Sequence, residues 1–171
     1  MPAIHVCPLS RLSATVAETG ARHVVTLIGA GTPVPRPMSV RADDHLLLHL
    51  DDILEPMDGM THPGEAHVGM FLDFFRAWDR AHPVVVHCWA GVSRSTAAAF
   101  SALCLLRPDL DEATIAGRIR ARSKEATPNA LFVAAADRLL KRDGRMSAAI
   151  SGIGRGAHAF EGSVFSLRID E

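Results

Sequence analysis

The stretch VVVHCWAGVSRS (residues 84–95) decides how this chain folds. Three consecutive valines followed by His87 are typical of a strand that is buried on both faces of a sheet. The run that follows, residues 93–106, is rich in alanine and predicts a helix that packs closely on that sheet. We therefore expect a buried strand that leads through a short, glycine-containing loop into a helix.

The same alternation of strand and helix extends to both sides of this stretch. Apolar runs at residues 4–9, 23–28 and 45–50 predict three more strands. Residues 65–81 predict an amphipathic helix, because their large apolar side chains recur at helical spacing: Val68, Phe71, Leu72, Phe75 and Trp78. Further helices are expected after Ser10, near Asp111, and from Thr127-Pro128 to about Gly144.

This order predicts the α/β class, with a mostly parallel central sheet flanked by helices. With 171 residues and 48% hydrophobic content, the chain can bury a core of its own. We expect one domain over residues 1–145. Residues 146–171 contain several glycines and a weak pattern, and they are expected to be a loosely ordered C-terminal extension that packs on the domain or on a partner.

Composition argues against several functional classes. The 18 basic and 19 acidic residues leave a net charge of -1, so no global field favours nucleic acid. Charged residues interrupt every apolar run, so membrane insertion is not expected. We expect a cytoplasmic location. Three widely spaced cysteines do not predict a disulfide framework. The histidines form no HExxH pattern, and neither a metal nor a cofactor is expected.

The loop between the buried strand and the Ala-rich helix has the properties of an anion site. A tight loop that leads into a helix N-terminus directs successive backbone N–H groups toward one point. The residues expected to bind a phosphate in this way are Trp89, Ala90, Gly91, Val92, Ser93 and Arg94. Gly91 allows a backbone conformation closed to other residues. The planar guanidinium of Arg94 can bind two phosphate oxygens at once.

Cys88 stands at the start of this loop, where the same donors favour the ionised thiolate over the thiol. Cys88 is therefore the expected nucleophile. Ser95 is placed to hydrogen-bond the sulfur as it leaves a phosphocysteine intermediate, and His87 is expected to brace the loop. An inert core position explains Cys7 and Cys104, but it does not explain Cys88 together with the spacing of the loop residues.

The segment HCWAGVSRS resembles the HCxxGxxRS signature of the protein tyrosine phosphatase superfamily, and it is most similar to the compact dual-specificity type. From about His23 onward the order of elements follows that family, and the segment TPNALF (residues 127–132) is similar to its PNxxF segment. The composition, with few lysines and a short chain, also resembles bacterial predicted protein tyrosine phosphatases. The resemblance implies a cysteine-phosphatase-like fold and a supporting role for Asn129. Where the family has glutamine three residues after the phenylalanine, this chain has Ala135.

The reaction also needs a general acid that protonates the leaving oxygen. By resemblance to the family pattern, in which a strand of this kind ends in an acid, we expect Asp52 to have this role. The separation of Asp52 from Cys88 is slightly longer than is typical of the family. Asp51 and Asp58 therefore remain open alternatives.

The expected function is hydrolysis of a phosphate monoester, with a phosphotyrosine-containing protein or peptide as the first choice of substrate. The loop interior has no lysine. In this it differs from the loops of related phosphatases that act on highly phosphorylated inositides. A dual-specificity, phosphoinositide or small-molecule phosphatase remains an alternative. A rhodanese-type sulfurtransferase and a non-catalytic phosphopeptide-binding module are less favoured, because the His87, Arg94 and Ser95 pattern favours phosphate chemistry and the expected nucleophile is present.

Overall fold

A computed structural model describes all 171 residues, and its centre is a five-stranded sheet with the order β3-β2-β4-β1-β5. The strands are β1 (Ala3–Pro8), β2 (His23–Ile28), β3 (His45–His49), β4 (Val84–Cys88) and β5 (Phe165–Arg168). The first four are parallel, and β5 runs antiparallel to β1. The α/β class with a mostly parallel central sheet is therefore confirmed.

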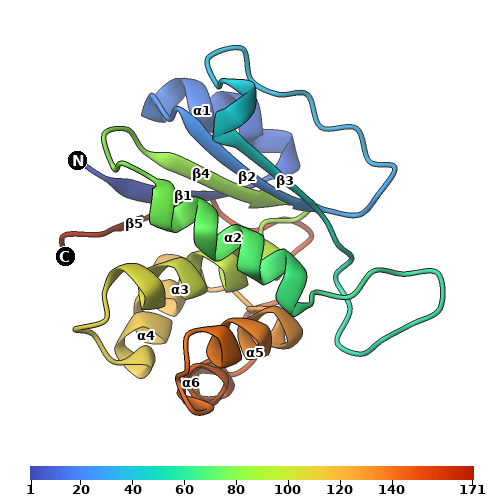
Figure 1. Cartoon of the computed structure of the whole chain (residues 1–171), viewed down its shortest axis with the longest axis vertical. Helices are drawn as coiled ribbons and strands as arrows, with labels where there is room; N and C mark the ends of the chain where they lie inside the picture. Colours follow the sequence, from blue (N-terminus) through green and yellow to red (C-terminus); the bar gives the residue numbers. More distant parts are fainter.

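Helices cover both faces of the sheet (Figure 1). They are α1 (Leu12–Thr19), α2 (Glu65–Ala77), α3 (Arg94–Leu106), α4 (Glu112–Arg122), α5 (Ala130–Leu139) and α6 (Arg145–Ile153). Helix α1 packs alone on one face, where its Leu12 and Val16 join a cluster of 7 buried residues. The other five helices cover the opposite face, over a core of 35 buried residues. The aromatic face predicted for α2 lies in this larger core.

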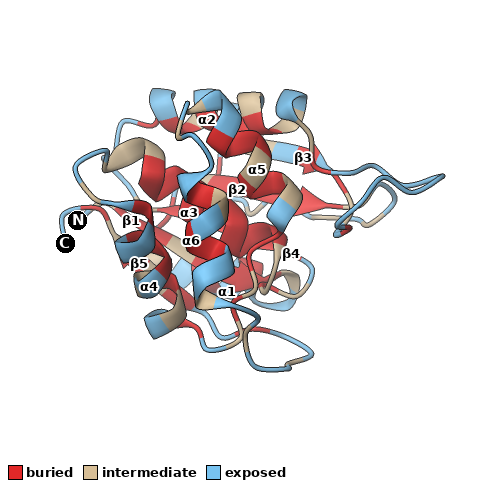
Figure 2. Cartoon of the chain, turned by 90° about the horizontal axis from the view of Figure 1, so that it is seen from below, coloured by how far each residue is buried: buried red, intermediate tan, exposed pale blue.

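The parallel register decides where the loops that contain Asp52 and follow Cys88 leave the sheet. Strand β4 lies between β2 and β1, with Cys88 opposite Pro8 and His87 opposite Thr26. The loops that follow β3 and β4 therefore leave the sheet at the same end. The loop over residues 51–64, between β3 and α2, extends away from the body of the molecule and is mostly exposed (Figures 1 and 2).

Residues 146–171 contain ordered elements that the sequence pattern did not predict. Most of helix α6 and all of strand β5 lie in this segment. The buried carboxylate of Asp137 accepts hydrogen bonds from the amides of Gly144 (2.7 Å) and Met146 (2.8 Å) and so caps the start of α6. Strand β5 has only four residues, of which Phe165 and Leu167 are buried. This alternation is too short to identify a strand from the sequence.

Candidate active site

Cys88 ends β4, a strand whose five residues are all buried. Cys88 is only 2% exposed. Its Sγ lies 3.1 Å from Oγ of Ser95, and the backbone amide of Gly91 donates a hydrogen bond to it at 3.3 Å. The fold thus brings the predicted nucleophile and Ser95 together at the base of the loop over residues 89–93, immediately before α3.

The carbonyl groups of this loop point outward, because neighbouring segments bind them. Four of them accept hydrogen bonds from backbone amides: Trp89 from Leu9 (3.1 Å), Ala90 from Gly162 (2.8 Å), Val92 from Thr127 (2.9 Å) and Ser93 from Asn129 (3.2 Å). In a planar trans peptide, the N–H of the next residue points opposite to the carbonyl. The amides of residues 90, 91, 93 and 94 therefore point inward, and none of the amides of residues 89–93 donates to a backbone oxygen.

Gly91 lies where no other residue fits. Its φ is +70°, in the left-handed region that favours glycine. A Cβ at this position would lie 2.8 Å from the backbone nitrogen of Pro8 and 2.9 Å from the carbonyl carbon of Cys7. The end of β1 therefore passes directly behind the loop and holds its curvature.

Arg94 is the first residue of α3, and it is 9% exposed. Its Nη1 donates to the carbonyl oxygen of Leu50 at 2.9 Å, which ties the start of α3 to the end of β3. Its buried Nε has no hydrogen-bond partner in the protein. A buried guanidinium nitrogen without an acceptor is unfavourable, so this side chain is suited to an anion that approaches the loop.

His87 takes part in a buried chain of hydrogen bonds on the other face of β4. Its Nδ1 faces only the carbonyl oxygen of Cys88 (3.3 Å) and so carries the ring proton, whereas its Nε2 accepts from Oγ1 of Thr26 (2.6 Å). Oγ1 of Thr26 in turn lies 2.8 Å from Nε2 of His45. Burial is the main cause that lowers the pKa of His87 to about 4, which favours the neutral ring.

Asp52 lies beside the loop and is held by two donors. Its Oδ1 accepts from Oγ of Ser93 at 2.6 Å and from Nδ2 of Asn129 at 3.0 Å. Asn129 also donates to the carbonyl oxygen of Ile53 (3.1 Å), and its own Oδ1 caps α5 by accepting from the amide of Phe132 (3.0 Å). Because Oδ1 of Asp52 is occupied, a proton on this carboxyl group would be carried by Oδ2.

The two alternative acids are placed differently. The backbone and side chain of Asp51 bind Thr61: its amide donates to the Thr61 carbonyl (2.7 Å), and its Oδ2 accepts from the Thr61 amide (2.8 Å). Asp51 therefore closes the base of the loop over residues 51–61. Asp58 lies at an exposed turn of the same loop and makes no hydrogen bond with the side chains or amides of residues 89–93. Of the three carboxylates, only Asp52 contacts the loop that holds Cys88.

The other two cysteines are core residues. Cys7 lies on β1 and Cys104 lies in α3, and both are buried without a disulfide. Burial raises the pKa of each thiol to about 12. Neither thiol forms a hydrogen bond with the loop, so Cys88 differs from both in its surroundings.

Two contributors to this site were missed in the sequence. Thr26 is the only polar residue after His23 in the strand HVVTLI, and a buried polar side chain in such a run was a signal that it binds another buried group. The amide of Gly162 binds the loop from a segment 72 positions after Ala90 in the sequence. No local sequence pattern predicts a hydrogen bond between residues so far apart along the chain.

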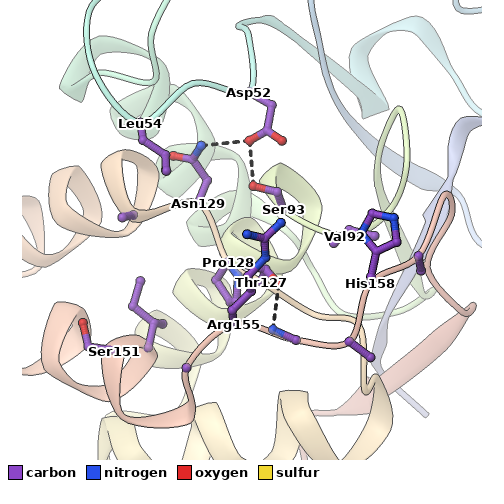
Figure 3. A pocket seen from close by; sticks show the side chains of 16 residues that line it. Asp52, Leu54, Val92, Ser93, Thr127, Pro128, Asn129, Ser151, Arg155 and His158 are labelled. Atoms are coloured by element: carbon purple, nitrogen blue, oxygen red, sulfur yellow. Dashed lines mark hydrogen bonds between the residues drawn. The ribbon is translucent and has the colours of Figure 1, made fainter.

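A cavity of about 530 Å³ lies beside the loop over residues 89–93 (Figure 3). Asp52, Ser93 and Asn129 line one side of it. The other side is formed by the end of α6 and residues 154–159, which include Arg155 and His158. Cys88 and Arg94 are not among its lining residues, so the cavity adjoins the loop without containing the thiol.

No group of three or more His, Cys, Asp or Glu side chains is arranged to hold a metal ion. None of the helices combines the length and the apolar character needed to cross a lipid bilayer.

No protein-family model and no curated protein matches this chain. Solved structures do match it. The PTP-2 phosphatase of Cydia pomonella has a TM-score of 0.62 and 20% identity, over 79% of this chain and 84% of that one. DUSP15 has a TM-score of 0.64 and 16% identity, over 89% and 92% of the two chains. The human tyrosine phosphatase-like serine/threonine/tyrosine-interacting protein has a TM-score of 0.63 and 17% identity, over 82% and 92%. The chain therefore has the fold of the compact dual-specificity and protein tyrosine phosphatases, as its signature loop led us to expect.

Proposed function

We propose that this chain hydrolyses phosphate monoesters through a phosphocysteine intermediate, with phosphotyrosine in a protein or peptide as the substrate. The observation that carries the proposal is the loop over residues 89–93. Four of its carbonyls are bound by neighbouring segments, so the amides that follow them face inward, and the amide of Gly91 donates to the sulfur of Cys88. A dianion above this thiol would meet the inward amides, the N-terminus of α3 and the guanidinium of Arg94.

In the first step, the Cys88 thiolate attacks phosphorus, and the bond from phosphorus to the substrate oxygen breaks. Asp52 donates a proton from Oδ2 to the leaving oxygen, which departs as a neutral hydroxyl group. Arg94 binds two of the equatorial oxygens through parallel N–H groups. The carboxylate of Asp52 and the phosphocysteine remain.

In the second step, water attacks phosphorus and the sulfur–phosphorus bond breaks. Asp52 accepts the proton of the water, so inorganic phosphate is released and the acid is restored. The hydroxyl of Ser95, 3.1 Å from the sulfur, donates to the departing thiolate. Ala135 is buried and has no polar group, so orientation of the water rests with Asp52 in this proposal.

Phosphotyrosine is favoured over a highly phosphorylated inositide because residues 89–94 contain one cation, Arg94, and no lysine. Trp89 supports the same choice. It is 51% exposed at the rim of the loop, where its ring can pack against an aromatic side chain that enters from solvent. The fold alone does not decide the matter, because it is shared with a protein described as phosphatase-like. The proposal rests on the residues of the loop.

A turnover panel tests the proposal directly. The unaltered protein should hydrolyse phosphotyrosine peptides faster than matched phosphoserine peptides or a soluble inositol polyphosphate. Cys88→Ser should abolish turnover. Arg94→Lys keeps the charge but loses the planar pair of donors, so turnover should fall on the order of a hundredfold. Near-normal turnover in either variant would remove that residue from the mechanism.

The assignment of the general acid is tested by leaving groups. Asp52→Asn should slow hydrolysis of an aryl phosphate with a poor leaving group on the order of a hundredfold, and hydrolysis of para-nitrophenyl phosphate much less. Asp51→Asn is the matched control, because it changes the adjacent carboxylate in the same way. If Asp51→Asn alone shows this dependence on the leaving group, Asp51 is the acid and the assignment to Asp52 is wrong.

A further inference from the structure

The cavity beside the phosphate loop has no role in the mechanism proposed above. It shares Asp52 and Ser93 with the candidate active site, but its opposite wall comes from the end of α6 and residues 154–159 (Figure 3). The segment over residues 154–162, here called the strap, also binds the carbonyl of Ala90 through the amide of Gly162. The strap thus connects the wall of the cavity to the loop that holds Cys88.

The strap is held in place by side chains and backbone of the main body. Arg120 donates to the carbonyl oxygens of Ile153 (2.7 Å) and Gly154 (2.7 Å). The amide of Gly156 donates to Oγ1 of Thr127 (3.0 Å), and the amide of Ala157 donates to the carbonyl of Lys124 (2.8 Å). A Cβ on Gly156 would lie 2.4 Å from the carbonyl oxygen of Glu125, so this residue fits only as glycine. The backbone positions from which the strap's side chains project are therefore set before any ligand binds.

Arg155 projects from this fixed segment and is not neutralised. No carboxylate lies within 4.0 Å of its guanidinium, and it donates no hydrogen bond within the protein. Figure 3 draws its side chain extending across the cavity toward Ser93. Most other arginines bind a carboxylate or a backbone carbonyl, as Arg142 and Arg107 do. His158, farther along the strap, lines the same cavity.

Asp52 is the carboxylate on the cavity wall, and it does not form an ion pair with Arg155. Oδ1 of Asp52 is occupied by Ser93 and Asn129, and the proposed mechanism requires Asp52 to be protonated when the substrate binds. A ligand with a negative charge would therefore meet the free guanidinium of Arg155 opposite a carboxyl group that already holds two donors.

We infer that this cavity binds an acidic side chain of the substrate peptide, within a few residues of the phosphorylated residue, through Arg155. The inference rests on the proposed phosphotyrosine function. The distance along the peptide follows from the shared wall: Asp52 and Ser93 border both the reaction site and the cavity, and an extended peptide advances about 3.3–3.6 Å per residue. Arg155 is thus a specificity-determining residue.

Paired peptides test this inference. A phosphotyrosine peptide of neutral sequence is compared with versions in which Glu replaces Gln at one position at a time, up to three residues on either side. The ratio of kcat/KM for the Glu and Gln peptides is measured with the unaltered protein and with Arg155→Gln. The ratio cancels any difference in the concentration of active protein.

At one or more positions the unaltered protein should prefer Glu by about threefold or more at low ionic strength, and Arg155→Gln should lose this preference. Added salt should reduce the preference in the unaltered protein, because an accessible charge pair is screened. The matched control is Arg22→Gln. Arg22 is exposed, forms no ion pair, and lies at the amino end of β2, at the opposite end of the sheet from Cys88. That variant should keep both the preference and the turnover of para-nitrophenyl phosphate.

Two results overturn the inference, and they are distinguishable. If peptides are hydrolysed but the unaltered protein shows no preference for Glu, or if Arg155→Gln retains it, the cavity does not read an acidic side chain and the proposed function stands. If the unaltered protein hydrolyses para-nitrophenyl phosphate but none of the peptides, the phosphotyrosine function itself fails and the inference fails with it.

Discussion

Mild acid should destabilise this protein through His87. The ring is buried between β4 and its neighbours, and burial, opposed by its hydrogen bond to the Cys88 carbonyl, lowers its pKa from the ordinary value of 6.5 to about 4. Nearby positive groups, His45 and Arg94, lower the pKa further. The folded protein therefore holds a neutral His87 at pH values where the unfolded chain has bound a proton.

The magnitude follows from the difference between the two pKa values. Above pH 6.5 the ring is neutral in both states, so His87 causes no pH dependence. Between pH 6.5 and about 4 only the unfolded chain binds the proton, and the free energy of unfolding decreases as the pH falls. At 1.36 kcal/mol per pH unit, the loss from this group reaches on the order of 3 kcal/mol near pH 4. This is a large fraction of the stability of a typical domain.

The assay is urea denaturation at several pH values from 7 to 4, followed by fluorescence of Trp78 and Trp89. The unaltered protein is compared with His87→Gln, which has no titrating ring, and with His49→Gln, which changes an exposed histidine on β3. Titrating groups other than His45, whose charge acts on His87, contribute alike to the unaltered protein and to His87→Gln. Between pH 6.5 and 4, the free energy of unfolding should therefore fall by on the order of 3 kcal/mol more in the unaltered protein than in His87→Gln.

Equal pH dependence in the unaltered protein and His87→Gln would refute this reasoning. His87→Gln also loses the acceptor for Thr26, so it will be less stable at every pH. If it does not fold, NMR titration of the His87 ring in the unaltered protein decides the question. The ring should stay neutral at pH 5, and protonation with a midpoint near 6.5 would contradict the argument.

Three other changes test the loop and its supports. Iodoacetate at pH 6 should alkylate Cys88 faster than Cys7 or Cys104, because burial raises the pKa of those two thiols to about 12. Phosphate should protect Cys88. Equal rates for the three cysteines would contradict an activated thiolate. Gly91→Ala places a Cβ against the end of β1 and requires alanine to adopt a left-handed backbone conformation. The free energy of unfolding in urea should fall by at least about 1–2 kcal/mol, and turnover should slow. An unchanged protein would show that the loop is not held as described. Asn129→Ala removes the cap of α5 and a donor to Asp52, the proposed general acid. Stability should fall by about 1 kcal/mol, and turnover of poor leaving groups should fall more than that of good ones. Equal losses for both kinds of substrate would limit Asn129 to a structural role.

Much of the fold was accessible from local sequence patterns. A run of three valines can be buried only as an interior strand or within a helix, and the glycine-containing loop that follows excludes a continued helix. The three other early strands and the helix with the aromatic face followed from periodicity in the same way, and their observed bounds differ from the predicted ones by only a few residues. Helix ends were less accurate: the helix expected to reach residue 81 ends at Ala77, and the helix expected to reach about Gly144 ends at Leu139. Helix α5 begins at Ala130 and not at Thr127, because Asn129 has a non-helical backbone (φ -58°, ψ 120°) and its side chain caps the helix by accepting from the amide of Phe132.

The pairing of distant segments followed from no local pattern. The last strand contributes only Phe165 and Leu167 to the core, and its position depends on the free edge that β1 offers. The difference between the two adjacent acids is of the same kind. Asp51 and Asp52 are chemically equal in the sequence, but the amide of Thr61 binds one of them, and Ser93 with Asn129 binds the other.

The sequence by itself determined the chemistry that this chain can offer: a cysteine at the end of a buried strand, a glycine where the loop must turn, and an arginine at the start of the next helix. Those properties depend on residues that are neighbours along the chain. Only the tertiary structure decided what surrounds them: the segments that bind the loop carbonyls and turn its amides inward, the acid that contacts the loop, and the strap that directs Arg155 into the cavity. The physical reason is that a hydrogen bond between residues such as Ala90 and Gly162 forms only after the packing of the core has brought their segments together.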